Sequence, residues 1–380
     1  MPSAPSARFQ IRSLRVEPYA LPFRTPFRTA HGTLAQRQGF VVWVEDENGT
    51  WGVGEAAPLE GFGMESHAEC QATLERLQAR LAGLVIDVPE TGEDWAAPLK
   101  AEDRTSPAAC HGVECALLHL AALRRGLPLA RWLCAQAPAS VALNATVGAD
   151  TPQEAARQAL EWTARGFGTL KLKVGVGGAA ADVARLAAVR SAVGNAVKLR
   201  VDANGAWSEP EALETLDLLA PYHLEYCEQP VPAGDWAALA RVCAASPVPI
   251  AADEAASSES QALAILEHHA AHVLVLKPMA LGGLTPLIRI ARRAVTQGVP
   301  VVVTTMLEGA YARWAALHGA AALAGILGER VPLPACGLAT GPLLAQDLTE
   351  QVPLPIKGHF VLPSGPGLGL EGLRPRPSGL

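Results

Sequence analysis

The segment Thr-Leu-Lys-Leu-Lys-Val-Gly at residues 169–175 is the first of five similar segments. The others are Arg-Val-Asp-Ala-Asn-Gly-Ala-Trp (200–207), Glu-Tyr-Cys-Glu-Gln-Pro (225–230), Ile-Ala-Ala-Asp-Glu (250–254) and Val-Leu-Val-Leu-Lys-Pro (273–278). Each has the pattern of a short apolar strand that ends on a charged residue. The charged ends Asp202, Glu228, Asp253 and Lys277 are 26, 25 and 24 residues apart. This is the length of one strand–helix unit in an α/β barrel of ~250 residues.

The carboxyl ends of parallel barrel strands meet at one mouth, so we expect these charged side chains to converge there. Three carboxylates brought together repel one another, and a divalent cation would relieve that repulsion. Oxygen ligands favour Mg2+, with Mn2+ as the alternative. Residues two apart on a strand share a face, so Lys171 and Lys173 should point together into the mouth. The sequence therefore predicts a metal site flanked by lysines.

Composition excludes several classes of partner. The chain has 380 residues, 49% of them hydrophobic and 18% charged, which suits a soluble globular protein of two domains. Its net charge is −6 and it has no basic run, so nucleic acid and anionic membranes are not expected partners. No apolar run approaches the ~20 residues of a membrane span, and we expect a cytoplasmic protein.

We predict three regions. Residues 1–135 form an α+β capping (lid) domain, 136–341 a modified (β/α)7β TIM barrel, and 342–380 a C-terminal segment that returns to the cap. In the cap, strands are expected at 11–21, 39–45 and 51–56, with an Asn-Gly hairpin turn between the last two. Helices are expected near 66–84 and 106–125. Barrel strands are expected at 141–147, 169–174, 196–202, 225–229, 250–253, 273–277, 301–304 and, weakly, 336–339. Barrel helices are expected at 151–165, 179–193, 209–219, 236–245, 258–268, 284–297 and 310–327.

Two cap segments are candidates for covering the mouth. Residues 22–37 carry prolines, arginines and phenylalanines and are too rich in Pro and Thr to suggest a regular element. Residues 54–66 are glycine-rich with large apolar side chains. Either could be ordinary surface loop, but beside a barrel we interpret both as loops that contact substrate. Phe27, Arg28 and Phe62 are the expected contacts.

The residues imply proton abstraction next to a carboxylate. A lysine that acts as a base must lose its proton near neutral pH, and a second cation nearby favours that loss. Lys171 is that neighbour for Lys173. A carboxylate substrate held by the metal would lose its alpha proton to Lys173, while Lys277 on the opposite side stabilises the negative charge.

These motifs, in this order and at this spacing, resemble the enolase superfamily, specifically its muconate lactonizing enzyme subgroup. The resemblance covers essentially the whole chain. It implies Asp202, Glu228 and Asp253 as Mg2+ ligands, with Lys173 and Lys277 on either side of a small carboxylate substrate. Asn204, Glu254, Thr305, Met306 and Glu308, which stand at strand ends, are expected to bind substrate. The mandelate racemase subgroup has a histidine at the seventh strand end, where this chain has Val-Thr-Thr-Met-Leu-Glu-Gly (303–309).

One such site supports several reactions. Residues 54–66 and 337–347 resemble segments of o-succinylbenzoate synthases, which eliminate water in menaquinone biosynthesis. Residues 305–309 are closer to muconate cycloisomerases. Dipeptide epimerases usually carry an Asp-x-Asp in this region, which residues 306–308 do not provide. We therefore predict the synthase, a carbon–oxygen lyase, ahead of N-acylamino acid racemase, with cycloisomerase and epimerase below them.

A catalytically silent barrel that binds metal or assembles with partners is the alternative from another class. The presence of Lys173, Asp202, Glu228, Asp253 and Lys277 together disfavours it. Enzymes of this kind are commonly homo-oligomers, but the sequence shows no interface.

Overall fold

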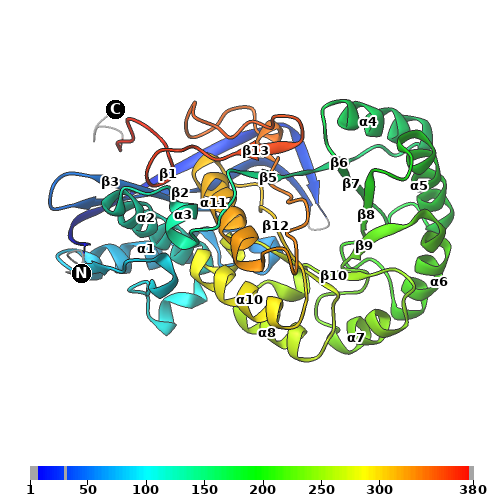
Figure 1. Ribbon diagram of the computed structural model, residues 1–380, viewed down its shortest axis with the longest axis horizontal. Coiled ribbons are helices and arrows are strands. Elements are labelled where there is room, and N and C mark those ends of the chain that lie inside the picture. The colour runs from blue at the N-terminus through cyan, green and yellow to red at the C-terminus, as the bar shows by residue number, and fades with distance from the viewer. Residues whose placement is uncertain (1–6, 30–31, 376–380) are drawn as a thin grey trace.

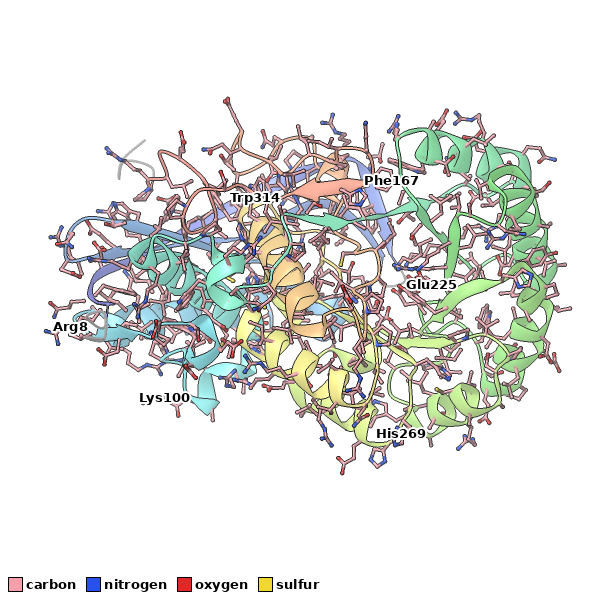
Figure 2. All side chains as sticks on the ribbon, in the orientation of Figure 1. Arg8, Lys100, Phe167, Glu225, His269 and Trp314 are labelled. Atoms are coloured by element: carbon pink, nitrogen blue, oxygen red, sulfur yellow. The ribbon has the colours of Figure 1, made fainter. Side chains whose placement is uncertain are left out.

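The computed structural model describes residues 7–29 and 32–375. It shows an N-terminal cap beside a barrel of parallel strands wrapped by helices (Figure 1). In Figure 2, the labelled Lys100 marks the cap and Glu225 marks a barrel strand. The α/β class with a strand-rich cap is as predicted, whereas the limits of the three predicted regions stay a prediction.

The cap is a four-stranded antiparallel sheet in the order β3-β2-β1-β4. Its elements are β1 (Ala7–Thr29), β2 (Gly32–Asp46), β3 (Trp51–Ala56), α1 (His67–Leu81), β4 (Val85–Val88), α2 (Pro107–Arg125) and α3 (Leu129–Leu133). Gly54 allows α2 to pack on β3, because a Cβ there would lie 2.0 Å from the carbonyl oxygen of Gly112. The predicted turn forms, with Oδ1 of Asp46 accepting from the amides of Asn48 and Thr50.

The prediction that residues 22–37 form irregular loop is wrong. Within the described residues, β1 extends to Thr29 and β2 begins at Gly32, and the two strands pair as a long hairpin in which Phe27 pairs with Leu34 and Leu21 with Arg37. Proline has no backbone N–H and cannot donate a hydrogen bond to a neighbouring strand. The pairing of β1 with β2 shifts register between Pro22 and Phe27, so the prolines of this stretch are tolerated. The mouth is therefore approached by a β-ribbon.

Seven parallel strands form the barrel sheet in the order β12-β11-β10-β9-β8-β7-β6. They are β6 (Asn144–Val147), β7 (Thr169–Lys173), β8 (Lys198–Asp202), β9 (Leu224–Glu228), β10 (Ile250–Ala252), β11 (Val273–Leu276) and β12 (Val301–Val303). The helices between and after them are α4 (Pro152–Ala164), α5 (Ala179–Val193), α6 (Glu209–Leu219), α7 (Trp236–Ala245), α8 (Glu259–Glu267), α9 (Pro278–Leu281), α10 (Leu284–Thr296) and α11 (Ala310–Leu327). Figure 1 shows α4 to α7 on the outside of the strands.

The weakly predicted eighth strand appears only as isolated parallel bridges. Cys336 bridges to Leu143, and Gly337 bridges to Thr304. These bridges join the segment before β6 to the end of β12, so they close the sheet into a ring. The predicted strand at 141–147 is divided: Ser140–Ala142 (β5) instead pairs antiparallel with β13 (His359–Val361) in a separate sheet.

The inner face of the barrel carries the expected layer of side chains. Tyr226, Ala251, Val273, Val275 and Val302 form a buried cluster of their own, apart from the main core. This confirms that Val273 and Val275 face inward beneath the strand ends.

The C-terminal segment runs back over the cap. Leu344 bridges to Phe23 of the β1–β2 hairpin, and Gly367 bridges to Pro128 before α3. Within the described residues, no helix has the length and apolar character needed to cross a bilayer.

Candidate active site

The strand register brings the predicted charged residues to one level. Lys173 stands opposite Asp202, and Asp202 stands opposite Glu228, at the carboxyl ends of β7, β8 and β9. Asp253 and Lys277 follow directly after β10 and β11. The three carboxylates are almost fully buried, with exposed fractions of 1%, 2% and 6% for Asp202, Glu228 and Asp253. The predicted convergence is therefore present.

The lysines are bound directly to these carboxylates. Nζ of Lys171 donates to Asp202 at 3.0 Å and to Glu228 at 2.9 Å. Nζ of Lys173 donates to the same Asp202 oxygen at 2.5 Å, so both lysines do point together. Lys277 forms a short ion pair with Asp253. Lys173 is the most accessible of the three lysines, with 46% of its side chain exposed against 16% for Lys171 and 19% for Lys277.

Burial and neighbouring charges together raise the pKa values of Glu228 and Lys171 and lower that of Asp202. Burial, followed by the charge of Asp202, raises the pKa of Glu228 to about 7. Burial would raise the pKa of Asp202 as well, but Lys171 and Lys173 outweigh it and the net shift is downward. Burial would lower the pKa of Lys171, yet the charges of Asp202 and Glu228 hold it well above its usual value. Lys171 is thus a fixed cation between two acids.

Two amide side chains hold the cluster in place. Oδ1 of Asn204 accepts from Lys173 at 2.6 Å, while Nδ2 donates to Glu254 at 2.9 Å. Oε1 of Gln229 accepts from the backbone amides of Asp253 and Ala255, each at 3.1 Å. Asn204 and Gln229 both have positive φ values, 45° and 40°, which turn the chain sharply after the strand. The second oxygen of Glu254 is buried without a partner.

The donor set fits a magnesium ion chemically. Three carboxylates from adjacent strand ends supply hard oxygen ligands, and the raised pKa of Glu228 indicates that this buried pocket favours additional positive charge. Among the described residues, no group of three acidic, His or Cys side chains is already gathered around one point. The carboxylate oxygens instead accept from the ammonium groups of Lys171 and Lys277.

The residues predicted after β12 line a different part of the mouth. Oγ1 of Thr305 lies 2.9 Å from Oγ1 of Thr340. Met306 is 5% exposed. The carboxylate of Glu308 is buried and accepts from the Met306 amide, so this side chain turns back onto its own segment. Burial, and then the charge of Glu55, raises the pKa of Glu308 to about 7.

The cap residues predicted to contact substrate lie on two elements. Phe27 is half-buried on the β1–β2 hairpin and stacks on Phe23 at 5.7 Å between ring centroids. Phe62 ends a short 3-10 helix (Glu60–Phe62) and lines a cavity of about 620 Å³ between the cap and the segments after β10 and β11. Arg28 lies in β1 opposite Thr33, and its side chain falls outside the described part of the structure.

Four residues of the mouth are not among those predicted from the sequence. Gln229 and Thr340 support the strand ends, whereas Arg37 and Glu55 reach the segment after β12 from the cap. Gln229 lies inside a charged strand-end motif, whereas Arg37, Glu55 and Thr340 lie inside the segments 22–37, 54–66 and 337–347, which are singled out from the sequence without these residues being named. The contacts of Arg37 and Glu55 span 269 and 254 residues, a separation that no local pattern encodes.

Known protein families match both the barrel and the cap of this chain. Residues 154–374 match the family described as "Enolase C-terminal domain-like", and residues 11–120 match the "MenC, N-terminal domain". The chain is 32% identical to the hydrophobic dipeptide epimerase of Enterococcus faecalis, over 95% of this chain and 99% of the relative. It is 41% identical to the o-succinylbenzoate synthase of Thermobifida fusca, over 59% of this chain and 66% of the relative.

A solved structure agrees over nearly the full length. The dipeptide epimerase from E. faecalis, complexed with Mg and the dipeptide L-Leu-L-Tyr, superposes with a TM-score of 0.82 at 28% identity, covering 95% of this chain and 99% of the other. The family match spans more than half of the chain and includes every strand end that carries a lysine or carboxylate of the site. The chain therefore belongs to the enolase superfamily of enzymes.

Proposed function

We propose that this protein is a Mg2+-dependent carbon–oxygen lyase that removes a proton alpha to a carboxylate and eliminates water, with the activity of an o-succinylbenzoate synthase. Asp202, Glu228 and Asp253 would hold the metal, which supplies positive charge that acidifies the alpha proton of a bound carboxylate. The substrate class is a small carboxylate that carries a leaving hydroxyl. The cytoplasmic location and a homo-oligomeric state stay predictions.

Each lysine has a separate role in this proposal. Lys173 is the accessible amine, so it takes the alpha proton at Nζ and returns it to the departing hydroxyl on the same face. Lys277 is held against Asp253, and although burial alone would lower its pKa, the charges of Asp253 and Glu254 raise it. A protonated Lys277 donates to developing negative charge on the opposite face without transferring its proton. Lys171 keeps Asp202 and Glu228 in position.

The choice of reaction rests on the residues that follow β12 and on residues 336–340, the segment in which Cys336 and Gly337 bridge to the neighbouring strands. A dipeptide has a free ammonium group that needs a carboxylate partner. Among the described residues, the only acid in 304–308 and 336–340 is Glu308, and its carboxylate is buried against the Met306 amide. The hydroxyls of Thr305 and Thr340 stand there instead. Hydroxyl groups can donate to the oxygens of a substrate, whereas the described residues of these two segments offer no free carboxylate to pair with an ammonium group.

Similarity supports the same choice. The identity to the T. fusca synthase is 41% over 59% of this chain, against 32% over 95% for the E. faecalis epimerase, and the cap matches the MenC N-terminal domain. Epimerisation of dipeptides is the second candidate, because the epimerase relative matches nearly the whole chain. Two lysines on opposite sides of the substrate are also what a two-base epimerase requires. N-acylamino acid racemisation and cycloisomerisation of muconate remain weaker alternatives.

A direct assay separates these activities. The purified protein with Mg2+ is given the succinyl-hydroxycyclohexadiene carboxylate, and o-succinylbenzoate is followed by its absorbance. In parallel it is given L-Ala-L-Glu and N-succinyl amino acids in D2O, and deuterium uptake and optical rotation are followed. We expect fast dehydration and little exchange. Rapid epimerisation or racemisation with no dehydration would reject the proposed lyase activity.

A further inference from the structure

Arg37 connects three segments at the mouth that are far apart in the sequence. It lies on β2 near the base of the hairpin and is 2% exposed. Its Nη1 donates to the carbonyl oxygen of Pro58 at 2.6 Å, its Nη2 to that of Ala57, and its Nε to that of Met306 at 3.3 Å. A guanidinium has fixed donor directions, so these contacts define the relative positions of the carbonyls.

One contacted segment leads to the cavity between cap and barrel, and the other leads to the strand end of β12. Ala57 and Pro58 begin the segment after β3, which continues to Phe62 at the cavity between cap and barrel. Met306 belongs to the segment after β12, next to Thr305. The guanidinium therefore connects the cap directly to the barrel strand that follows the one carrying Lys277.

The turn after β12 contains an unfavourable backbone conformation that contacts from the cap stabilise. Leu307 has a φ of 65°, a left-handed conformation that costs a non-glycine residue about 1 kcal/mol or more. The turn is held from the cap on either side of Leu307: Arg37 donates to the carbonyl oxygen of Met306, the preceding residue, and Oε1 of Glu55 accepts from the amide of Gly309, two residues after Leu307, at 2.6 Å. Glu55 also accepts from the Tyr19 hydroxyl at 2.6 Å and from the Ala312 amide at 3.0 Å, at the start of α11. Side chains of β2 and β3 in the cap thus form hydrogen bonds with both ends of the strained turn.

We propose that Arg37 is a positioning residue that fixes the Met306–Gly309 turn relative to the Ala57–Phe62 segment of the cap, and that it thereby sets how tightly substrate is bound. This inference rests on the proposed use of the mouth as the reaction site. Arg37 acts through the Ala57–Phe62 segment and the turn, and the lysines keep their own contacts without it. Its loss should weaken substrate binding more than it slows the proton transfer.

The variants Arg37→Met and Arg37→Lys test this, with Arg12→Met as the matched control. Arg12 is an arginine of the same cap sheet whose side chain is 54% exposed and pairs with Glu45. Hydrogen exchange of the whole protein is measured by mass spectrometry in peptides covering 57–64 and 304–310. In Arg37→Met both segments should exchange at least about 10-fold faster together, because hydrogen bonds to a charged donor are lost, while 169–173 stays protected.

Kinetics give the second readout. For the succinyl-hydroxycyclohexadiene carboxylate, KM should rise at least about 10-fold in Arg37→Met with a smaller fall in kcat, the pattern of lost binding that is common to ground and transition states. Mg2+ affinity should match that of the wild type. Arg37→Lys, which keeps the charge and some donors, should recover part of the effect, and it carries the test if Arg37→Met does not fold.

The proposal fails if exchange at 304–310 is unchanged, or if all peptides including 169–173 lose protection equally, which would mean a general loss of stability. It also fails if kcat falls while KM is unaltered. The exchange experiment needs no substrate, so it judges Arg37 even if the wild type does not dehydrate the synthase substrate. A wild type that does not dehydrate this substrate would reject the proposed function. Hydrogen exchange alone would then decide the positioning role of Arg37.

Discussion

Nζ of Lys173 lies 2.6 Å from Oδ1 of Asn204, whose Nδ2 donates in turn to Glu254 at 2.9 Å. Asn204 thus orients the accessible lysine with a neutral acceptor. Replacement by aspartate preserves the side-chain shape and tolerates the positive φ of this position. The added carboxylate would stabilise the ammonium form of Lys173, so the free base would form only at higher pH. We expect Asn204→Asp to move the acidic limb of the kcat profile to higher pH.

The measurement is kcat against pH for the wild type and Asn204→Asp with saturating Mg2+. Asn204→Gly is the control that keeps the backbone conformation and adds no charge. It should lower kcat without displacing the acidic limb. An unchanged limb in Asn204→Asp would mean that Lys173 is not the titrating base.

Metal removal should abolish activity and lower stability. If the buried carboxylates Asp202, Glu228 and Asp253 hold the metal as proposed, EDTA-treated protein should be inactive and should recover with Mg2+ or Mn2+. Mg2+ at about 100 times its Kd should stabilise the fold by about 2.7 kcal/mol, seen as a higher Tm. In Glu228→Gln this Mg2+-dependent rise should be much smaller. Glu209→Gln, at an exposed ion pair with Arg241, should respond like the wild type. An equal rise in Tm for Glu228→Gln would contradict the ligand assignment.

The barrel could be predicted from the sequence because its signals are local and repeated. Each strand end from Lys173 to Lys277 follows an apolar run, and a regular spacing placed them on one rim, where the structure has them. The helices at 179–193, 209–219, 236–245 and 310–327 match the structure residue for residue. The alternation on the inner face, as at Val273 and Val275, depends only on strand geometry.

The hairpin at residues 22–37, the eighth strand and the contacts between cap and barrel depend on residues far apart in the sequence. Residues 22–37 have a composition typical of a loop, and they become strands only because the partner hairpin arm and Leu344 are available. The eighth strand is weak because only Cys336 and Gly337 bridge to their neighbours. The segments that contain Arg37 and Glu55 were predicted to cover the mouth, but the contacts of these two residues could not be predicted, because their partners around Met306 and Gly309 are brought near by the packing of the cap on the barrel. Glu308 was predicted to bind substrate from its position at a strand end, and the direction of its side chain was not visible in the sequence.

Three buried histidines should make the fold sensitive to acid. Burial lowers the pKa of His111 and of His318 from 6.5 to about 4, and that of His119 to about 3. Each is neutral in the folded state, with Nδ1 of His119 accepting from the Val53 amide and Nδ1 of His318 from the Ala130 amide. Because their folded pKa is depressed, unfolding takes up protons below pH 6.5. Their stabilisation is present above pH 6.5 and is lost as pH falls towards 4, at about 1.4 kcal/mol per pH unit for each group.

Urea unfolding between pH 7.5 and about pH 5 checks this sign. The free energy of unfolding should fall steadily as the solution is acidified, and His318→Gln should reduce the slope. An unfolding free energy that rises on acidification would contradict the neutral buried histidines.

The central claim is that Lys173 alone moves the proton while Lys277 remains a fixed cation. It is tested most directly by single-turnover dehydration of the succinyl-hydroxycyclohexadiene carboxylate, deuterated at the alpha carbon, by the wild type, Lys173→Ala and Lys277→Ala with Mg2+. We predict product with a primary isotope effect in the wild type and a loss of about 10³-fold or more in Lys173→Ala. Lys277→Ala should slow the reaction but retain the isotope effect and exchange only on the face of Lys173. Exchange on both faces in the wild type, each lost with a different lysine, would contradict the claim and show a two-base epimerase.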